Sequence, residues 1–232
     1  MNVLLFGATG MVGQGVLREC LLDPGVESVV SIGRSATGGR SASGVSDPKL
    51  REIVLADLTD YSTIDWQLTG FDACFFCLGI SSAGLSEEQY TLVMYDITLR
   101  AAETLARLNT GMTFVYVSGA GTDNTEHGRT MWARVKGRTE NALLRLPFKV
   151  AFMFRPGIIV PRFGARSKTT SYRILYMLSR PVLPLLRRAF PNQVLTTDEI
   201  GRAMLIVARQ GAPKPVLETC DIRLLLKRSA AA

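Results

Sequence analysis

The chain has 232 residues, 47% of them hydrophobic, and a formal net charge of +7. This length and composition predict one α/β domain with an ample core. They exclude a bilayer-spanning protein, because no uninterrupted apolar run is long enough, and we find no pattern of a secretory signal.

The first predicted elements are a strand, a glycine-rich turn and a helix. Residues 3–6 are apolar and end a strand predicted over 2–6, and Gly7, Gly10 and Gly13 follow before a helical pattern over 11–22. Gly7 permits a sharp turn, Gly10 lets the backbone approach a pyrophosphate, and Gly13 lets the helix lie close to the strand. The free N–H groups at the helix start favour phosphate. The alternative is a glycine-rich turn without a ligand; the placement between strand and helix favours dinucleotide binding.

This G-x-x-G-x-x-G spacing, with Ala-Thr between the first two glycines, resembles the extended and atypical short-chain dehydrogenase/reductase superfamily. The resemblance implies a doubly wound parallel Rossmann sheet with helices on both faces and a small C-terminal helical extension. It also implies that Thr9, Met11 and Val12 contact the cofactor together with the three glycines.

The second strand, predicted over 27–32, bears on the choice of cofactor. NAD-binding sites commonly carry an acid at the end of this strand for the ribose 2′-hydroxyl. Here Arg34 takes that place with no acid nearby, and an arginine binds a 2′-phosphate through charge-assisted hydrogen bonds. We therefore predict NADP(H) rather than NAD(H), the alternative being a solvent-exposed arginine. Residues 35–48 form a Gly/Ser-rich loop in which Arg40 can approach the adenosine end.

The next segments are a strand over 52–56, a short helix over 61–68 and a buried strand over 71–78. By the resemblance, Asp57 and Leu58 lie near the adenine, and the motif Cys77-Leu78-Gly79 lies beside the cofactor ribose. Cys74 and Cys77 are three apart on a strand and so point to opposite faces. We therefore expect no shared metal and no disulfide, which suits a reduced, cytoplasmic protein.

A capping box at Ser86 begins a long helix over 87–108, followed by a strand over 112–118, a helix over 131–146 and a strand over 150–154. The last strand runs into Arg155-Pro156-Gly157, which matches a family element whose following residues, here Ile158 and Ile159, lie against the nicotinamide. Ligands of such sheets bind at the carboxyl ends of the strands. Six candidate positions fall there: Gly7, Arg34, Asp57, Gly79, Ser118 and Pro156.

The family's catalytic residues are matched only in part. Members use a Ser, then Tyr-x-x-x-Lys on one helix face, with Tyr as the proton donor or acceptor. Ser118 and Lys136 match, but Trp132 stands at the tyrosine position. An indole N–H does not exchange its proton at accessible pH, so Trp132 is expected to stack or close the pocket. Proton transfer then falls to other groups, such as Ser118 or the single histidine, His127. The alternative is that His127 is a surface residue without a catalytic role.

The C-terminal part is basic. Residues 1–100 hold 6 Lys and Arg against 12 Asp and Glu, whereas residues 101–232 hold 21 against 8, and 141–197 contain no acid. This excess of basic residues is typical of a protein that binds an anionic substrate, a membrane surface or nucleic acid. The alternative is a basic face that is only solvated. Without a recognisable DNA- or RNA-binding motif we expect no specific nucleic-acid partner. Helical patterns over 172–179 and 185–190 suggest a lid or a membrane-facing surface. We predict a helix over 197–209, an edge strand over 216–219, and disorder from Lys227.

We divide the chain into an NADP(H)-binding core, 1–160, and a substrate or lid segment, 161–232, within the same domain. The resemblance is closest to the NADPH-binding, epimerase-like atypical group that includes the Tat-interacting protein TIP-thirty. It implies an oxidoreductase or epimerase-like activity on a small apolar or anionic substrate, and a homodimer is an open possibility. The alternative is a non-catalytic NADP(H) sensor whose basic face binds a partner or membrane.

Overall fold

The computed structural model describes residues 1–37, 47–165 and 193–231. Within them, seven parallel strands form one sheet in the order β3-β2-β1-β4-β5-β6-β9. These strands are β1 (Asn2–Phe6), β2 (Ser28–Gly33), β3 (Leu50–Val54), β4 (Ala73–Phe76), β5 (Thr113–Val117), β6 (Val150–Arg155) and β9 (Val216–Glu218). A second parallel pair consists of β7 (Ile158–Val160) and β8 (Val194–Thr196).

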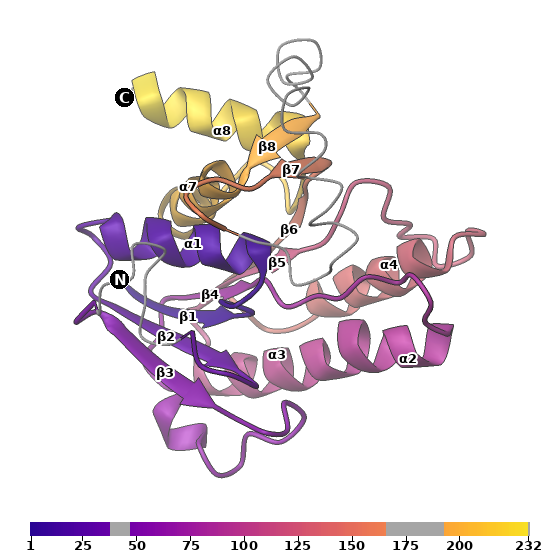
Figure 1. Cartoon of the computed structure of the whole chain (residues 1–232), viewed down its shortest axis with the longest axis horizontal. Helices are drawn as coiled ribbons and strands as arrows, with labels where there is room; N and C mark the ends of the chain where they lie inside the picture. Colours follow the sequence, from indigo (N-terminus) through magenta and orange to yellow (C-terminus); the bar gives the residue numbers. More distant parts are fainter. Residues whose placement is uncertain (38–46, 166–192, 232) are drawn as a thin grey trace.

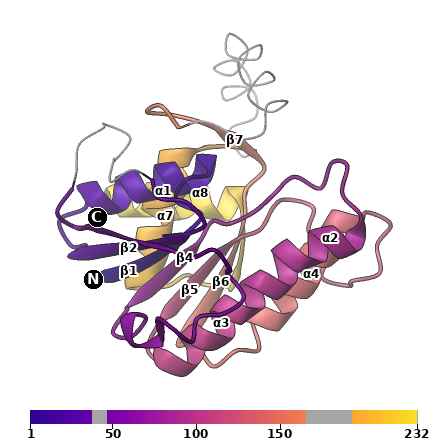
Figure 2. The same cartoon turned by 60° about the horizontal axis from the view of Figure 1, so that its bottom comes forward.

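Helices cover both faces of the sheet. In Figures 1 and 2, α1, α7 and α8 lie on one face, and α2, α3 and α4 lie on the other. Their bounds are α1 (Met11–Leu22), α2 (Glu87–Thr91), α3 (Ile97–Leu108), α4 (Met131–Leu143), α7 (Thr197–Gln210) and α8 (Thr219–Ala231). A π-helical turn (Leu92–Asp96) joins α2 to α3. Strand β1 alternates accordingly, with Val3 and Leu5 in the first core layer and Leu4 and Phe6 in the second.

The strand order places the topological switch point of the sheet beside the turn between β1 and α1. The chain runs from β1 outward to β2 and β3, then crosses back to β4 on the other side of β1. The carboxyl ends of β1 and β4 are therefore neighbours whose connections leave in opposite directions, which is where doubly wound sheets bind dinucleotides. The predicted fold class, a doubly wound parallel sheet, is confirmed.

Helices α1 and α7 cross at a very short distance because each contributes a glycine. A Cβ added to Gly15 of α1 would lie 2.5 Å from the Cβ of Thr197, and one added to Gly201 of α7 would lie 3.0 Å from the Cα of Val16. Across the same contact, both Arg209 guanidinium nitrogens donate to the Asp23 carboxylate, at 2.9 and 2.6 Å. The helix that leaves the glycine turn is thus held by a segment nearly 200 residues further along the chain.

Several predicted elements are shifted or shorter. The strand predicted over 71–78 is only β4, Ala73–Phe76, and the helix predicted over 131–146 is α4, which ends at Leu143. The strand predicted over 52–56 is β3, two residues earlier, because its register against β2 pairs Leu50 with Val29 and Val54 with Gly33. The helix predicted over 61–68 is only a 3₁₀ turn, Asp65–Gln67. Side-chain bonds oppose a longer helix there, since the Asp60 carboxylate accepts from the Ser62 N–H at 2.9 Å.

The prediction of a disordered tail from Lys227 is wrong. Helix α8 continues to Ala231. Ile222 is fully buried, and Leu225 and Leu226 pack against the same core layer, so an apolar stripe at helical spacing anchors this segment. The helices predicted over 172–179 and 185–190 lie outside the described residues. Within the described part of the chain, no helix is long and apolar enough to cross a membrane.

Candidate functional site

The turn between β1 and α1 requires glycine at two of its three glycine positions. Gly7 has a φ of 79°, and an added Cβ would lie 2.6 Å from the backbone nitrogen of Leu78. A Cβ on Gly13 would lie 2.1 Å from the carbonyl oxygen of Gly7. The turn after β1 is therefore pressed against the residues after β4 on one side and against α1 on the other.

The start of α1 is left open by this turn. Its N-cap is Gly10, which has no side chain to cap the helix, and the first turn contains no acid. The Gly10 N–H donates to the Gly7 carbonyl at 2.9 Å, so the N–H groups of the next residues, Met11 and Val12, are those left for a ligand. Thr9 lies within the turn, and its carbonyl accepts from the Gln14 amide at 3.0 Å. Open N–H groups at the start of a helix suit a pyrophosphate.

Arg34 and Asp57 follow the neighbouring strands β2 and β3. Arg34 is exposed, and its side chain makes no ion pair or hydrogen bond with the described part of the chain. The Asp57 carboxylate accepts from the Thr59 hydroxyl at 2.7 Å and from its N–H at 2.8 Å, which holds the pKa of this carboxyl below its usual value. Leu58 is buried beneath it. Arg40 lies outside the described residues.

The residues after β4 lie on the other side of the turn between β1 and α1. The Cys77 N–H donates to the Phe6 carbonyl at 2.9 Å, which joins this segment to β1 beyond the end of β4. Leu78 is half-buried and Gly79 is exposed. Cys77 packs against the core layer opposite to that of Cys74, as the strand geometry predicts, and burial raises the pKa of both thiols.

Ser118 lies at the end of β5 and is almost buried. Its hydroxyl is 2.9 Å from the Thr122 hydroxyl, which itself donates to the Gly119 carbonyl at 2.7 Å. Because Thr122 has only one proton, Ser118 is the donor in their bond. Sequence reasoning missed Thr122; the short glycine-rich run between the two hydroxyls was the available signal.

Lys136 reaches this serine from α4. Its ammonium donates to the Ser118 carbonyl at 3.1 Å and lies 5.7 Å from the centroid of the Tyr116 ring. Burial lowers the pKa of Lys136 to about 8, while the nearby Glu140 carboxylate acts in the opposite direction. The structure thus brings Ser118 and Lys136 together as the family pattern requires.

Trp132 lies one helical turn before Lys136. Its ring is half-buried and lies over Gly121, where an added Cβ would be 3.5 Å away. The indole thus covers the loop that follows Ser118. His127 is exposed on that same loop, where its backbone N–H donates to the Thr125 hydroxyl at 3.3 Å.

The Arg155-Pro156-Gly157 element is fixed by the loops around it. The Pro156 carbonyl accepts from the Ala120 N–H at 3.0 Å, and the Gly157 N–H donates to the Thr219 hydroxyl at 2.8 Å. Ile158 follows in β7 with 42% of its surface exposed, whereas Ile159 is half-buried. Backbone contacts therefore place Pro156 beside the loop that contains Ser118.

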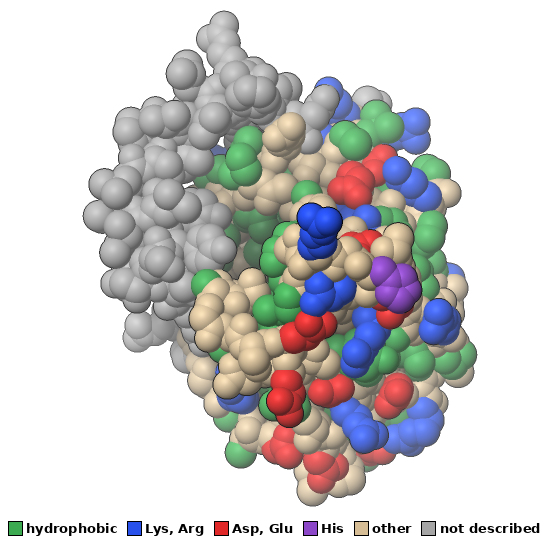
Figure 3. Space-filling view, turned by 90° about the vertical axis from the view of Figure 1, so that its right-hand side faces the viewer, with side chains coloured by type: hydrophobic (Ala, Val, Ile, Leu, Met, Phe, Trp, Pro, Cys, Tyr) green, Lys and Arg blue, Asp and Glu red, His purple; other side chains and the backbone are tan. Residues whose placement is uncertain are grey.

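The basic stretch over 141–197 does not form one cationic surface in the part that the structure describes. Arg155 is buried and paired with Glu140, and Arg162 lies 3.7 Å from the Asp198 carboxylate. The face shown in Figure 3 carries Lys and Arg interspersed with Asp and Glu. Six bases of this stretch lie outside the described residues: Arg166, Lys168, Arg173, Arg180, Arg187 and Arg188.

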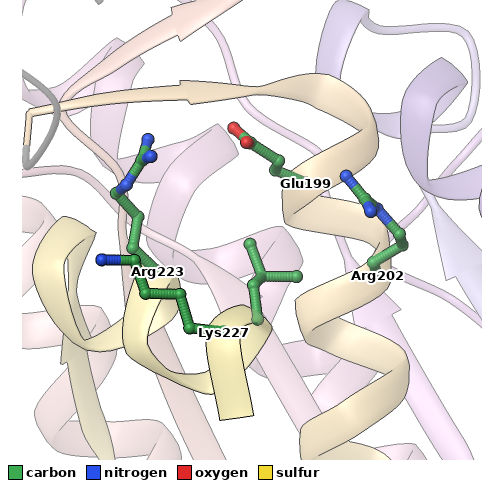
Figure 4. Close-up of a pocket in the computed structure, with 5 residues that line it drawn as sticks. Glu199, Arg202, Arg223 and Lys227 are labelled. Atoms are coloured by element: carbon green, nitrogen blue, oxygen red, sulfur yellow. The ribbon is translucent and has the colours of Figure 1, made fainter. Parts of the chain in front are cut away.

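A groove of about 200 Å³ lies elsewhere, between α7 and α8. Figure 4 shows Glu199 and Arg202 entering it from α7, and Arg223 and Lys227 from α8. Two of its cations already have partners, since Arg202 donates to Asp198 at 3.2 Å and Arg223 to the Val194 carbonyl at 3.0 Å. None of the predicted site residues lines this groove, so we place the functional site at the sheet edge.

Comparisons with known proteins identify the family of this chain. Residues 3–129 match the NAD dependent epimerase/dehydratase family. The mitochondrial protein fmp52 of Emericella nidulans is 31% identical over 161 residues, which cover 68% of this chain and 66% of that protein, just under two thirds of its length. The mitochondrial protein fmp52-2 of Aspergillus terreus is 26% identical over 88% of this chain and 85% of that protein.

A solved structure supports the fold over the whole chain. The UDP-glucuronic acid 4-epimerase from Bacillus cereus, crystallised in complex with NAD, superposes with a TM-score of 0.64 at 15% identity. The superposition covers 100% of this chain and 85% of the epimerase. At this identity the likeness concerns the fold alone.

The cytoplasmic location predicted from the sequence is contradicted by these relatives and is corrected here. Both fmp52 proteins are named as mitochondrial. The prediction relied on the absence of a secretory signal and on four unpaired cysteines, and the free thiols are indeed present at Cys20, Cys74, Cys77 and Cys220. Reduced thiols do not distinguish one intracellular compartment from another.

Proposed function

This chain belongs to the NAD dependent epimerase/dehydratase family, and on that premise we propose that it is an NADP(H)-dependent oxidoreductase acting on a small apolar or anionic substrate. The observation that carries the proposal is the convergence, at the carboxyl ends of β1, β4 and β5, of an open helix start with Ser118 and Lys136. The glycine cradle fits a dinucleotide, since a Cβ at Gly7 or Gly13 would collide with backbone.

In this proposal each residue has a defined task. The open start of α1 binds the pyrophosphate, and Arg34 binds the ribose 2′-phosphate. NADP(H), when bound, supplies or accepts the hydride. Lys136 holds the nicotinamide ribose through the ammonium protons that its bond to the Ser118 carbonyl leaves available. Ser118 orients the substrate carbonyl once its hydroxyl proton turns from Thr122 to the substrate. The apolar side chains of Trp132 and Ile158 border the space in which the substrate binds.

We predict that NADPH binds more tightly than NADH and that Arg34→Ala removes this preference. Each charge-assisted contact to the 2′-phosphate contributes about 1.5–3 kcal/mol, so the variant is expected to lose roughly ten- to a hundred-fold in NADPH affinity with little change for NADH. Calorimetric titration with both cofactors measures this. Arg51→Ala removes an exposed arginine from the adjacent strand β3 and is the matched control. Equal affinities in the wild type would rule out the assignment.

We also predict that NADPH affinity falls as the pH rises through about 8. The pKa of Lys136 is near that value, and its ammonium is protonated below it and neutral above it. Deprotonation removes a cation and one N–H donor from the ribose site, so affinity is lost on the alkaline side. Titrations between pH 6.5 and pH 9.5, about 1.5 units on either side of that pKa, test this. Lys136→Ala should flatten the profile, whereas Lys214→Ala, which removes an exposed lysine of the C-terminal segment, should not. A wild-type affinity that is constant over this range would contradict the role of Lys136.

A second candidate function is an NADP(H) sensor without catalysis, and Trp132 is the observation that favours it. The indole occupies the position of the family's proton donor. Its N–H does not ionise at accessible pH, so it cannot act as the acid. In this case the basic residues of 141–197 bind an anionic partner or a membrane surface. The variants Trp132→Tyr and Trp132→Phe separate the two functions.

A further inference from the structure

Helix α4 carries a buried ion pair that the proposed function does not use. Glu140 is fully buried, and Arg155 of β6 is 9% exposed. The arginine donates to the two carboxylate oxygens, from Nε at 3.0 Å and from Nη2 at 2.5 Å. Such a bidentate pair is strong and directional. A buried pair is nevertheless weak evidence for stability, because desolvation offsets much of its attraction.

The pair joins four segments of the chain. Asn124, from the loop after β5, donates to Glu140 at 3.0 Å and accepts from Arg155. Glu218 of β9 accepts from Arg155 at 3.3 Å and is 42% exposed at its side chain. The guanidinium thus has one buried carboxylate partner and one partly exposed one.

Helix α4 meets the loop after Ser118 at two successive turns. At the first, Lys136 donates to the Ser118 carbonyl, and a Cβ on Gly137 would lie 1.8 Å from the Asp123 carbonyl oxygen. At the second, one turn later, Glu140 accepts from Asn124. The loop backbone therefore lies directly on the helix, and the buried carboxylate holds it there next to the lysine.

The surroundings of Lys136 contain one nearby negative charge from the described residues. Strand β5 and the loop after it present the Tyr116 ring and the Ser118 carbonyl, which are uncharged. Glu140, one turn along the same helix, acts on the lysine as an opposite charge, while burial disfavours the ammonium. Arg155 stands behind Glu140 and is neutralised by its two carboxylate partners.

We propose that Glu140 is a positioning residue for Lys136: its clamped carboxylate holds α4 on the loop after Ser118 and keeps the lysine ammonium protonated at neutral pH. The inference rests on the proposed function in so far as Lys136 binds the cofactor ribose. The role of Glu140 in the protonation of Lys136 does not require a cofactor, so it is tested on the free protein.

The test is the rate at which trinitrobenzenesulfonate modifies Lys136, followed by peptide mass spectrometry as a function of pH. Only the neutral amine reacts, so the midpoint of the rate profile reports the protonation of this lysine. Glu140→Gln should shift the midpoint to lower pH by about one unit, because an opposite charge nearby is lost. Glu218→Gln removes the other carboxylate from the same arginine and should leave the midpoint unchanged. The midpoint for NADPH binding should shift in the same way.

Three results would overturn the proposal: an unchanged midpoint in Glu140→Gln, a shift to higher pH, or an equal shift in Glu218→Gln. Circular dichroism checks that each variant is folded. If Glu140→Gln deprives Arg155 of its buried carboxylate and the protein unfolds, the double variant Glu140→Gln with Arg155→Gln restores an amide pair, and its midpoint must also be lower. If the wild type binds no NADPH, the proposed function fails, while the labelling profile still decides the role of Glu140.

Discussion

Trp132→Tyr is expected to raise NADPH-dependent reduction of small carbonyl compounds by about a hundred- to ten-thousand-fold, the usual contribution of general acid–base catalysis. The variant places a phenol one helical turn before Lys136, whose ammonium already reaches Ser118. The cation stabilises the phenolate and so lowers the pKa of the new tyrosine. The measurement is the initial rate of NADPH oxidation on a panel of aldehydes and ketones, at NADPH concentrations that saturate each variant.

Trp132→Phe is the matched control for this experiment. It leaves the same void as the tyrosine, because both rings are smaller than the indole, but it lacks the hydroxyl. A gain in Trp132→Tyr that Trp132→Phe does not share is therefore due to proton transfer. Suppose that Trp132→Tyr binds NADPH normally and shows no gain on any carbonyl; the sensor function then takes precedence. Brisk wild-type turnover that Trp132→Phe leaves unchanged would instead assign the proton to other groups, with Ser118 and His127 the first to replace.

Gly10→Val should weaken the binding of either cofactor by at least about a hundred-fold while the protein remains folded. The backbone of Gly10 is extended, with φ −80° and ψ 164°, and valine adopts this conformation readily. An added Cβ would lie 3.2 Å from the Gly7 carbonyl oxygen, which requires only a small adjustment. The side chain would occupy the space before the first N–H groups of α1, where the pyrophosphate binds. Calorimetry and thermal unfolding together measure both effects.

Gly13→Ala provides the contrast within the same turn. Its Cβ would lie 2.1 Å from the Gly7 carbonyl oxygen and 2.9 Å from the Cα of Ala8, both backbone atoms that cannot move separately. We expect a loss of about 3 kcal/mol or more in the free energy of unfolding. Retained cofactor affinity in a folded Gly10→Val protein would place the dinucleotide elsewhere in the structure.

The elements set by local sequence were predicted well. Strand β1 and helix α1 begin and end where their apolar spacing and glycines indicate, because both signals lie within about 20 residues. Strand β3 was placed two residues late, since its bounds depend on pairing with β2. Helix α8 was not predicted because Leu225 and Leu226 stabilise it only through their contacts with the core.

In the candidate site, too, features set by local sequence were predicted, whereas contacts between distant segments were not. Ser118, Trp132 and Lys136 were identified from spacing along the chain, and the structure brings the serine and the lysine together. The Arg155 side chain was predicted as part of a basic surface, yet it is buried, because its partner Glu140 lies on another element. A single sequence does not show which acid meets which base across a fold. The one available signal was an acid four residues after Lys136, on the same helix face.

The crossing of α1 and α7 has a consequence for the order in which the chain folds during its synthesis. The face of α1 that carries Val16, Cys20 and Leu21 packs in the core layer to which α7 contributes Ile200 and Met204. At translation rates of about 5–20 residues per second, roughly 10–40 seconds separate the appearance of the two helices. Throughout that interval the apolar side of the nucleotide-binding helix lacks its partner. The nascent chain therefore depends on α7, and premature termination before this helix should leave a fragment that aggregates or recruits chaperones instead of forming a separate nucleotide-binding unit.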